Sequence, residues 1–124
     1  MTEFAPIGAV LSFLAPGKTV YVPGTSGESL ALIDALKGHP QSSKGVRFVS
    51  KWIPGINSFD CTSLHPEARS ISFFPLPQLK DAILSGRTNL MPHTYHRAYE
   101  HIERHIDLDV AFVHVSPPDE KRRL

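Results

Sequence analysis

The stretch TVYVPGTSGESLALIDALKG, residues 19–38, decides the fold class. Residues 19–22 are β-branched or aromatic, and they stop at Pro23 and Gly24, which is typical of a short buried strand. The residues that follow have the apolar periodicity of a helix. A strand, a glycine turn and a helix in this order form the first half of a parallel β-α-β unit.

The start of this helix carries a capping signal. Thr25 and Glu28 have the spacing of a capping box, which predicts that Thr25 is the N-cap. Leu30, Ile33 and Leu36 then repeat at helical spacing and predict one buried face.

The remainder of the chain repeats the alternation of strand and helix. Further strands are predicted at residues 46–50, 68–74, 89–92 and 110–115, and further helices open at Pro77 and after the capping residue Thr94. Parallel strands need crossover connections, which helices provide. The sequence therefore predicts a single α/β domain with an open, mainly parallel sheet of about five strands, flanked by three helices.

Composition limits the classes of function. A chain of 124 residues has room for one domain, and a formal net charge of +1 implies neither nucleic acid nor an anionic membrane as a partner. Cys61 is the only cysteine, so an intramolecular disulfide is impossible and a cytoplasmic location is expected. Residues 1–14 lack the basic start of a signal peptide, and Pro and Gly interrupt their apolar run.

Three stretches together resemble the N-terminal domain of the acetyl-CoA hydrolase/transferase family, which includes acetate and 4-hydroxybutyrate CoA-transferases. They are VPGTSGESLALIDAL at residues 22–36, FFPLPQLKDAILSGRTNLMPHTY at residues 73–95, and DLDVAFVHVSPPDE at residues 107–120. The resemblance covers most of the chain in the expected order. It implies an α/β fold of the CoA-transferase (NagB/RpiA-like) type over residues 1–124.

The resemblance also implies a chemistry. Family members transfer CoA between carboxylic acids or hydrolyse acetyl-CoA through a glutamyl-CoA thioester, and they use coenzyme A or an acyl-CoA as substrate with no covalently bound cofactor. Their catalytic glutamate belongs to a second domain, so no residue here takes its role. We therefore expect an inactive N-terminal half that forms a homo-oligomer or needs a partner chain, with Trp52, Phe59 and Phe74 on the uncovered surface. The alternative is a non-catalytic module that binds an acyl or CoA fragment or regulates a full-length relative.

Two segments are the candidate substrate-binding residues. The first is the glycine turn, whose backbone N–H groups at a helix start would suit a carboxylate, phosphate or thioester oxygen. The second follows the last predicted strand, at the edge where open α/β sheets bind ligands. An ordinary capped turn and a chain simply leaving its domain are the competing interpretations. The residues are Gly24, Thr25, Ser26, Gly27 and Glu28 in the turn, and Ser116, Pro117 and Asp119 in the second segment.

The histidines and the cysteine carry weaker hypotheses. His101 and His105 lie four residues apart on a predicted helix, but no cysteine or carboxylate completes a metal site at the usual spacing. His114 alternates within a predicted buried strand and is expected in the core. Cys61 lies in the long loop of residues 51–66, where it is expected to be inert. A basic run at Lys121 and the next two residues is expected to be solvated.

Overall fold

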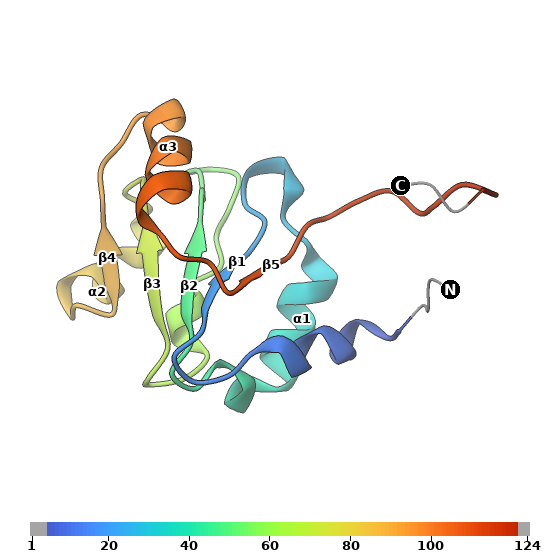
Figure 1. The fold of residues 1–124 in the computed structure, drawn as a ribbon. Helices are drawn as coiled ribbons and strands as arrows, with labels where there is room; N and C mark the ends of the chain where they lie inside the picture. The colour runs from blue at the N-terminus through green and yellow to red at the C-terminus, as the bar shows by residue number, and fades with distance from the viewer. Residues whose placement is uncertain (1–4, 122–124) are drawn as a thin grey trace.

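The computed structural model describes residues 5–121 and contains one five-stranded sheet, in the order β4-β3-β2-β1-β5 (Figure 1). Every strand pair is parallel. The strands are β1 Thr19–Tyr21, β2 Arg47–Ser50, β3 Arg69–Ser72, β4 Thr88–Leu90 and β5 Val110–Ala111. The predicted open parallel sheet is confirmed.

The predicted three α-helices are also present, together with short 3-10 helices. The α-helices are α1 Leu30–Gly38, α2 Lys80–Leu84 and α3 Tyr95–His105, and the 3-10 helices are η1 Ile7–Phe13, η2 Thr25–Gly27, η3 Pro40–Ser43, η4 Cys61–Ser63 and η5 Pro77–Leu79. Thr94 caps α3 as predicted, since its Oγ1 accepts a hydrogen bond from Arg97 N–H at 3.4 Å. None of these helices is long and apolar enough to cross a membrane, as far as residues 5–121 are concerned.

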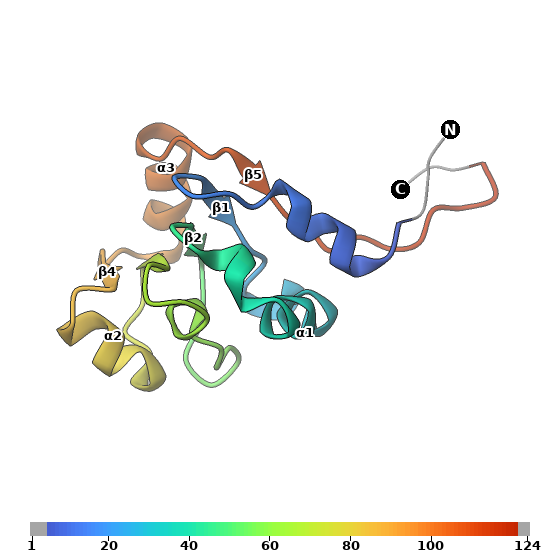
Figure 2. The ribbon, with the colours of Figure 1, turned by 90° about the horizontal axis from the view of Figure 1, so that it is seen from below.

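The helices cover the two faces of the sheet unequally. Figure 2 shows α1 and α2 below the sheet and α3 above it. Val20 and Phe48 point to the lower face, where they join α1, η1 and the loop residue Trp52 in the larger core. Val49 and Ile71 point to the upper face, where Ala98 of α3 closes a smaller core. The alternation follows from the two-residue period of a strand.

The order of the strands creates a switch point. The chain steps from β1 to β4 in one direction across the sheet, and then β5 returns to pair with the free side of β1. Ligands of open α/β sheets bind outside the carboxyl ends of the strands at such a reversal. The carboxyl ends of β1 and β5 are therefore the place to look for a site.

Several burial predictions are wrong near this reversal. The last strand ends at Ala111, and His114 is exposed rather than in the core, because β5 is an edge strand that only β1 covers. Val113 and Val115 are 73% and 51% exposed. Trp52, expected on the surface, is only 2% exposed because the long loop folds back onto the larger core.

The predicted helix faces are also only partly correct. Leu32 and Leu36 are buried in α1, but Leu30 is 70% exposed because it is the first helical residue and faces away from the sheet. On α3 the helical spacing of Tyr95, Ala98, Tyr99 and Ile102 predicts one buried stripe, but only Ala98 is buried and Tyr99 is 54% exposed. Lys121 is exposed, and the rest of the predicted basic run lies outside the described residues.

Candidate functional site

The turn after β1 has an unusual backbone. Thr25 has a φ of 53°, and it is the only non-glycine residue with a positive φ in residues 5–121. A β-branched residue rarely adopts this conformation, because Cβ crowds the backbone. Gly24 is in a tight place as well, since a Cβ there would lie 2.5 Å from Ser50 Oγ and 2.8 Å from the Lys51 carbonyl oxygen. The close approach of β2 and the residue after it therefore requires glycine at position 24. Position 27 has room for a side chain, because a Cβ there would contact only Pro23, at 3.8 Å.

A buried asparagine holds the strained residue in place. Asn57 is 2% exposed, and its Oδ1 accepts from Thr25 N–H and from Ile53 N–H, each at 2.9 Å. Its Nδ2 donates to the Thr25 carbonyl oxygen at 3.0 Å. Gln78 Nε2 also donates to the Asn57 carbonyl oxygen at 2.6 Å. The side-chain amide thus fixes both backbone groups of Thr25 and ties the long loop to the turn.

These contacts argue against the turn as a binding site for an anion. Thr25 N–H is taken by Asn57, and Gly27 N–H donates to the Gly24 carbonyl oxygen at 3.0 Å. The predicted N-cap is wrong: Ser29 caps α1, with its Oγ accepting from Leu32 N–H at 3.3 Å. Thr25 cannot cap α1 because the turn forms the separate 3-10 helix η2, and α1 begins only at Leu30.

A groove opens beside this turn at the switch point. It has a volume of about 230 Å³ and lies between η1, the start of α1 and the segment that follows β5. Its lining is mainly apolar, with Ser29 and His114 as the polar exceptions; the residues are Ile7, Val10, Pro23, Ser29, Leu32, Phe112, Val113, His114 and Val115. An apolar concave site with few polar groups is typical of small-molecule binding.

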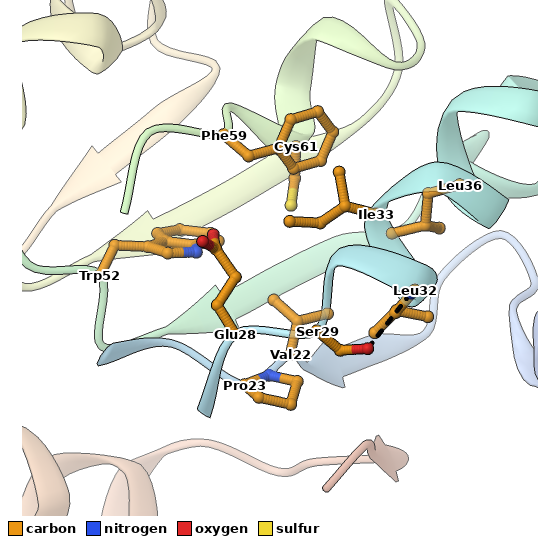
Figure 3. Close-up of a pocket in the computed structure, with 10 residues that line it drawn as sticks. All are labelled: Val22, Pro23, Glu28, Ser29, Leu32, Ile33, Leu36, Trp52, Phe59 and Cys61. Carbon is orange, nitrogen blue, oxygen red and sulfur yellow. Dashed lines mark hydrogen bonds between the residues drawn. The ribbon is translucent and has the colours of Figure 1, made fainter. Parts of the chain in front are cut away.

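Glu28 points away from this groove into a second, much smaller cavity. Figure 3 shows its carboxylate beside Trp52, among apolar side chains from α1 and the long loop. One carboxylate oxygen, Oε1, is buried without a hydrogen-bond partner among the described residues. The cavity of about 10 Å³ is the size of one water molecule, so it cannot admit a substrate.

Cys61 lines the same small cavity. Its side chain is buried, and burial raises the pKa of the thiol, to which the negative charges of Asp60 and Glu28 add. The thiolate is the reactive form of a cysteine, so this environment favours the neutral, less reactive thiol.

The second candidate segment is not brought to the turn. Residues 112–115 line the groove, but Ser116, Pro117 and Asp119 continue outward along the exposed C-terminal segment (Figures 1 and 2). Asp119 Oδ1 accepts from Lys121 N–H at 2.8 Å, within the segment itself.

The sequence interpretation missed Asn57 as a site residue. In the sequence, Asn57 stands out only as one of the residues that make segment 51–66 an irregular loop, and a loop of this length is often functional. The signal that could have found Asn57 is weak, because its partners lie 4 and 32 residues away.

Comparison with known proteins adds evidence for the fold. No protein-family model and no curated protein sequence matches the chain. Among solved structures, RipA from Yersinia pestis is similar with a TM-score of 0.73 and 20% identity, over 94% of this chain and 30% of that one. A glutamate-to-valine mutant and a phenylalanine-to-methionine mutant of RipA give TM-scores of 0.72 and 0.71, each at 22% identity and over 29% of the RipA chain.

This likeness concerns the fold alone, because the identities are low. The chain spans about 30% of the length of the RipA structure it matches. The part of RipA that matches is thus one α/β unit of a larger protein.

Proposed function

We propose that this domain is the N-terminal half of a CoA-transferase or acetyl-CoA hydrolase, acting on acyl-CoA thioesters and carboxylates. The observation that carries the proposal is the groove at the switch point. Pro23, Ser29 and Leu32 come from the first stretch that resembles the family, and residues 112–115 come from the third. Two stretches separated by about 75 residues thus supply the walls of one groove at the edge where such sheets bind ligands.

The covalent chemistry of the proposal requires a nucleophile from another domain or chain. Among residues 5–121, no carboxylate or thiol lines the groove. Glu28 and Cys61 face the water-sized cavity instead, and Ser29 Oγ already accepts the capping hydrogen bond of α1. Acyl transfer through a covalent intermediate needs an activated nucleophile in contact with the thioester. In this proposal the domain shapes the site in the cytoplasm, and a partner supplies the carboxylate.

Binding of acetyl-CoA tests the proposal directly. In NMR titrations we expect acetyl-CoA to shift the amide signals of residues 112–115. Val115→Glu places a negative charge at the groove and should weaken binding by about tenfold, the scale of one close charge interaction. Leu84→Glu is the matched control, because Leu84 is also an exposed aliphatic residue, 76% exposed on α2 and away from the groove.

Two results would contradict the proposal. One is the absence of any saturable shift with acetyl-CoA, and the other is equal weakening by both variants. Release of free CoA by the isolated chain, well above a heat-treated control, would contradict the requirement for an external carboxylate. Binding without turnover even beside a CoA-transferase C-terminal domain would favour a non-catalytic acyl or CoA-binding module.

A further inference from the structure

A stripe of basic side chains runs along the surface of α3. It consists of Arg97, His101, Arg104 and His105, spaced as one face of a helix, together with His93 just before the helix. These five residues and Glu100 are the complete lining of a cavity of about 150 Å³. We call this set of five the basic stripe.

The histidine rings of the basic stripe follow one another in a row, and adjacent rings are tilted by 37° and 48°. The ring centroids of His93 and His101 lie 5.0 Å apart, and those of His101 and His105 lie 5.1 Å apart. Phe73, buried at the end of β3, lies 6.0 Å from the rings of both His93 and His101. Contact with this core residue restricts the side chains of His93 and His101 in the unbound protein. Binding of a ligand would therefore cost less side-chain conformational entropy.

The stripe has an excess of positive charge in a chain that is nearly neutral overall. Glu100 is the only acidic residue in the lining, and it interacts with Arg97 Nη1 at 3.4 Å and with His96 Nε2 at 3.6 Å. Arg104 has no ion-pair partner within residues 5–121. One guanidinium is thus left to pair with a ligand.

The chemistry of the stripe selects the ligand. Guanidinium groups present several N–H donors that match the oxygens of a phosphate, and protonated imidazoles add further donors. A metal ion is disfavoured, because no group of three His, Cys, Asp or Glu side chains in the described part of the chain is arranged to hold one. We propose that the basic stripe binds the phosphate group of a small soluble ligand. This site lies on α3 and is independent of the proposed acyl-CoA groove.

Binding at the stripe should depend on pH. Burial of the ring lowers the pKa of His101, and the neighbouring His93 and His105 lower it further. The charged groups facing it are Arg97, Glu100 and Arg104 of α3, while the residue that follows β3, Phe73, contributes only an apolar ring. A bound dianion favours the protonated imidazoles, so by linkage affinity must rise as the pH falls through the histidine range.

Titration with sulfate, phosphate and a phosphomonoester tests this inference. Sulfate stays a dianion across the range, so its affinity at about pH 5.5 and about pH 8 reports on the histidines alone. We expect a roughly millimolar dissociation constant at the lower pH and at least tenfold weaker binding at the higher one. Amide and imidazole NMR signals of α3 provide the readout. Comparing inorganic phosphate with glycerol phosphate distinguishes a free ion from a phosphomonoester as the better ligand.

Variants separate the charge of the stripe from general effects. Arg104→Gln should weaken sulfate binding about tenfold at both pH values, and His101→Gln, in the middle of the histidine row, should reduce the dependence on pH. Lys80→Gln removes an exposed cation on α2 and is the matched control. The inference is overturned if no α3 signal moves in a saturable way up to roughly 50 mM sulfate. It is equally overturned if Lys80→Gln weakens binding as much as Arg104→Gln, or if affinity is the same at both pH values.

Discussion

Replacing Asn57 by alanine tests the central feature of the turn after β1. The side-chain amide accepts from Thr25 N–H and Ile53 N–H and donates to the Thr25 carbonyl oxygen. Asn57→Ala leaves these three part-buried backbone groups without a protein partner. Each such group costs about 1 kcal/mol or more, for a total of about 3 kcal/mol. Release of Thr25 from its positive φ returns about 1 kcal/mol, so we expect a net loss of about 2 kcal/mol.

Urea and thermal unfolding measure this loss. At about 4 °C per kcal/mol for a domain of this size, the melting temperature should fall by about 8 °C. Amide hydrogen exchange should accelerate at Thr25 and Ile53, whose N–H groups lose their acceptor. Asn57→Asp keeps the acceptor but loses the donor, so its effect should be intermediate.

Asn89→Ala serves as the control, because Asn89 is exposed in β4 and should change stability by less than about 0.5 kcal/mol. If Asn57→Ala were equally mild, or if the amides of Thr25 and Ile53 kept their protection, the stabilising role of the Asn57 side-chain hydrogen bonds would be refuted.

Three further predictions follow from the structure. Gly24→Ala should destabilise the fold by roughly 2 kcal/mol, because its Cβ would lie 2.5 Å from the Ser50 hydroxyl oxygen. Gly27→Ala should change stability by less than about 1 kcal/mol. Equal losses of unfolding free energy for the two variants in urea would contradict this prediction. Burial raises the pKa of Cys61, so its stabilising contribution is fully present below the pKa of the unfolded-state thiol and is lost as the pH rises above that pKa. Cys61→Ala should therefore flatten the loss of stability at alkaline pH in unfolding measurements. An unchanged alkaline slope would contradict this prediction. The hydrogen bond from Thr19 N–H and then the Lys18 ammonium lower the pKa of Asp109. The stabilisation by this carboxylate is therefore present above its unfolded-state pKa and is lost as the pH falls through its folded-state pKa. Asp109→Asn should reduce the acid sensitivity of unfolding, and an acid profile identical to that of the unmodified protein would refute the prediction.

The sheet could be predicted from the sequence because its information is local. Runs such as residues 19–22 and 46–50 carry β-branched residues bounded by turn residues, and each corresponds to an observed strand. The same reasoning failed at residues 110–115, where an apolar run suggested a strand covered on both faces. Only two of those residues pair in the sheet, because an apolar run does not reveal that its strand lies at an edge.

The candidate site was predictable only in part, because its key contacts are not local. The sequence correctly indicated a turn after β1. It could not indicate that Asn57 reaches back 32 residues to Thr25, or that Thr25 is strained rather than capping. A capping box is also a common pattern, and here Ser29, four residues later, satisfies the same helix start. Thr25 and Ser29 are both good N-cap residues by sequence, and only the tertiary structure shows that Ser29 is the one that caps α1.

The hydrogen bonds from Asn57 to Thr25 also limit how the turn after β1 could contribute to substrate binding. Strained backbone persists where surrounding contacts over-determine it, and this often occurs at functional sites. Here the strain does not create an anion cradle, because Asn57 and Gly24 already take the N–H groups of Thr25 and Gly27. The hydrogen bonds of Asn57 hold Thr25 two residues from Pro23, which lines the groove, although Thr25 itself does not. A rigid wall positions a ligand by shape and lowers the entropy cost of binding, and it leaves charge recognition to other groups. In the proposed function Pro23 and the other groove residues would set where an acyl group lies, while a carboxylate nucleophile from a partner would carry out the transfer.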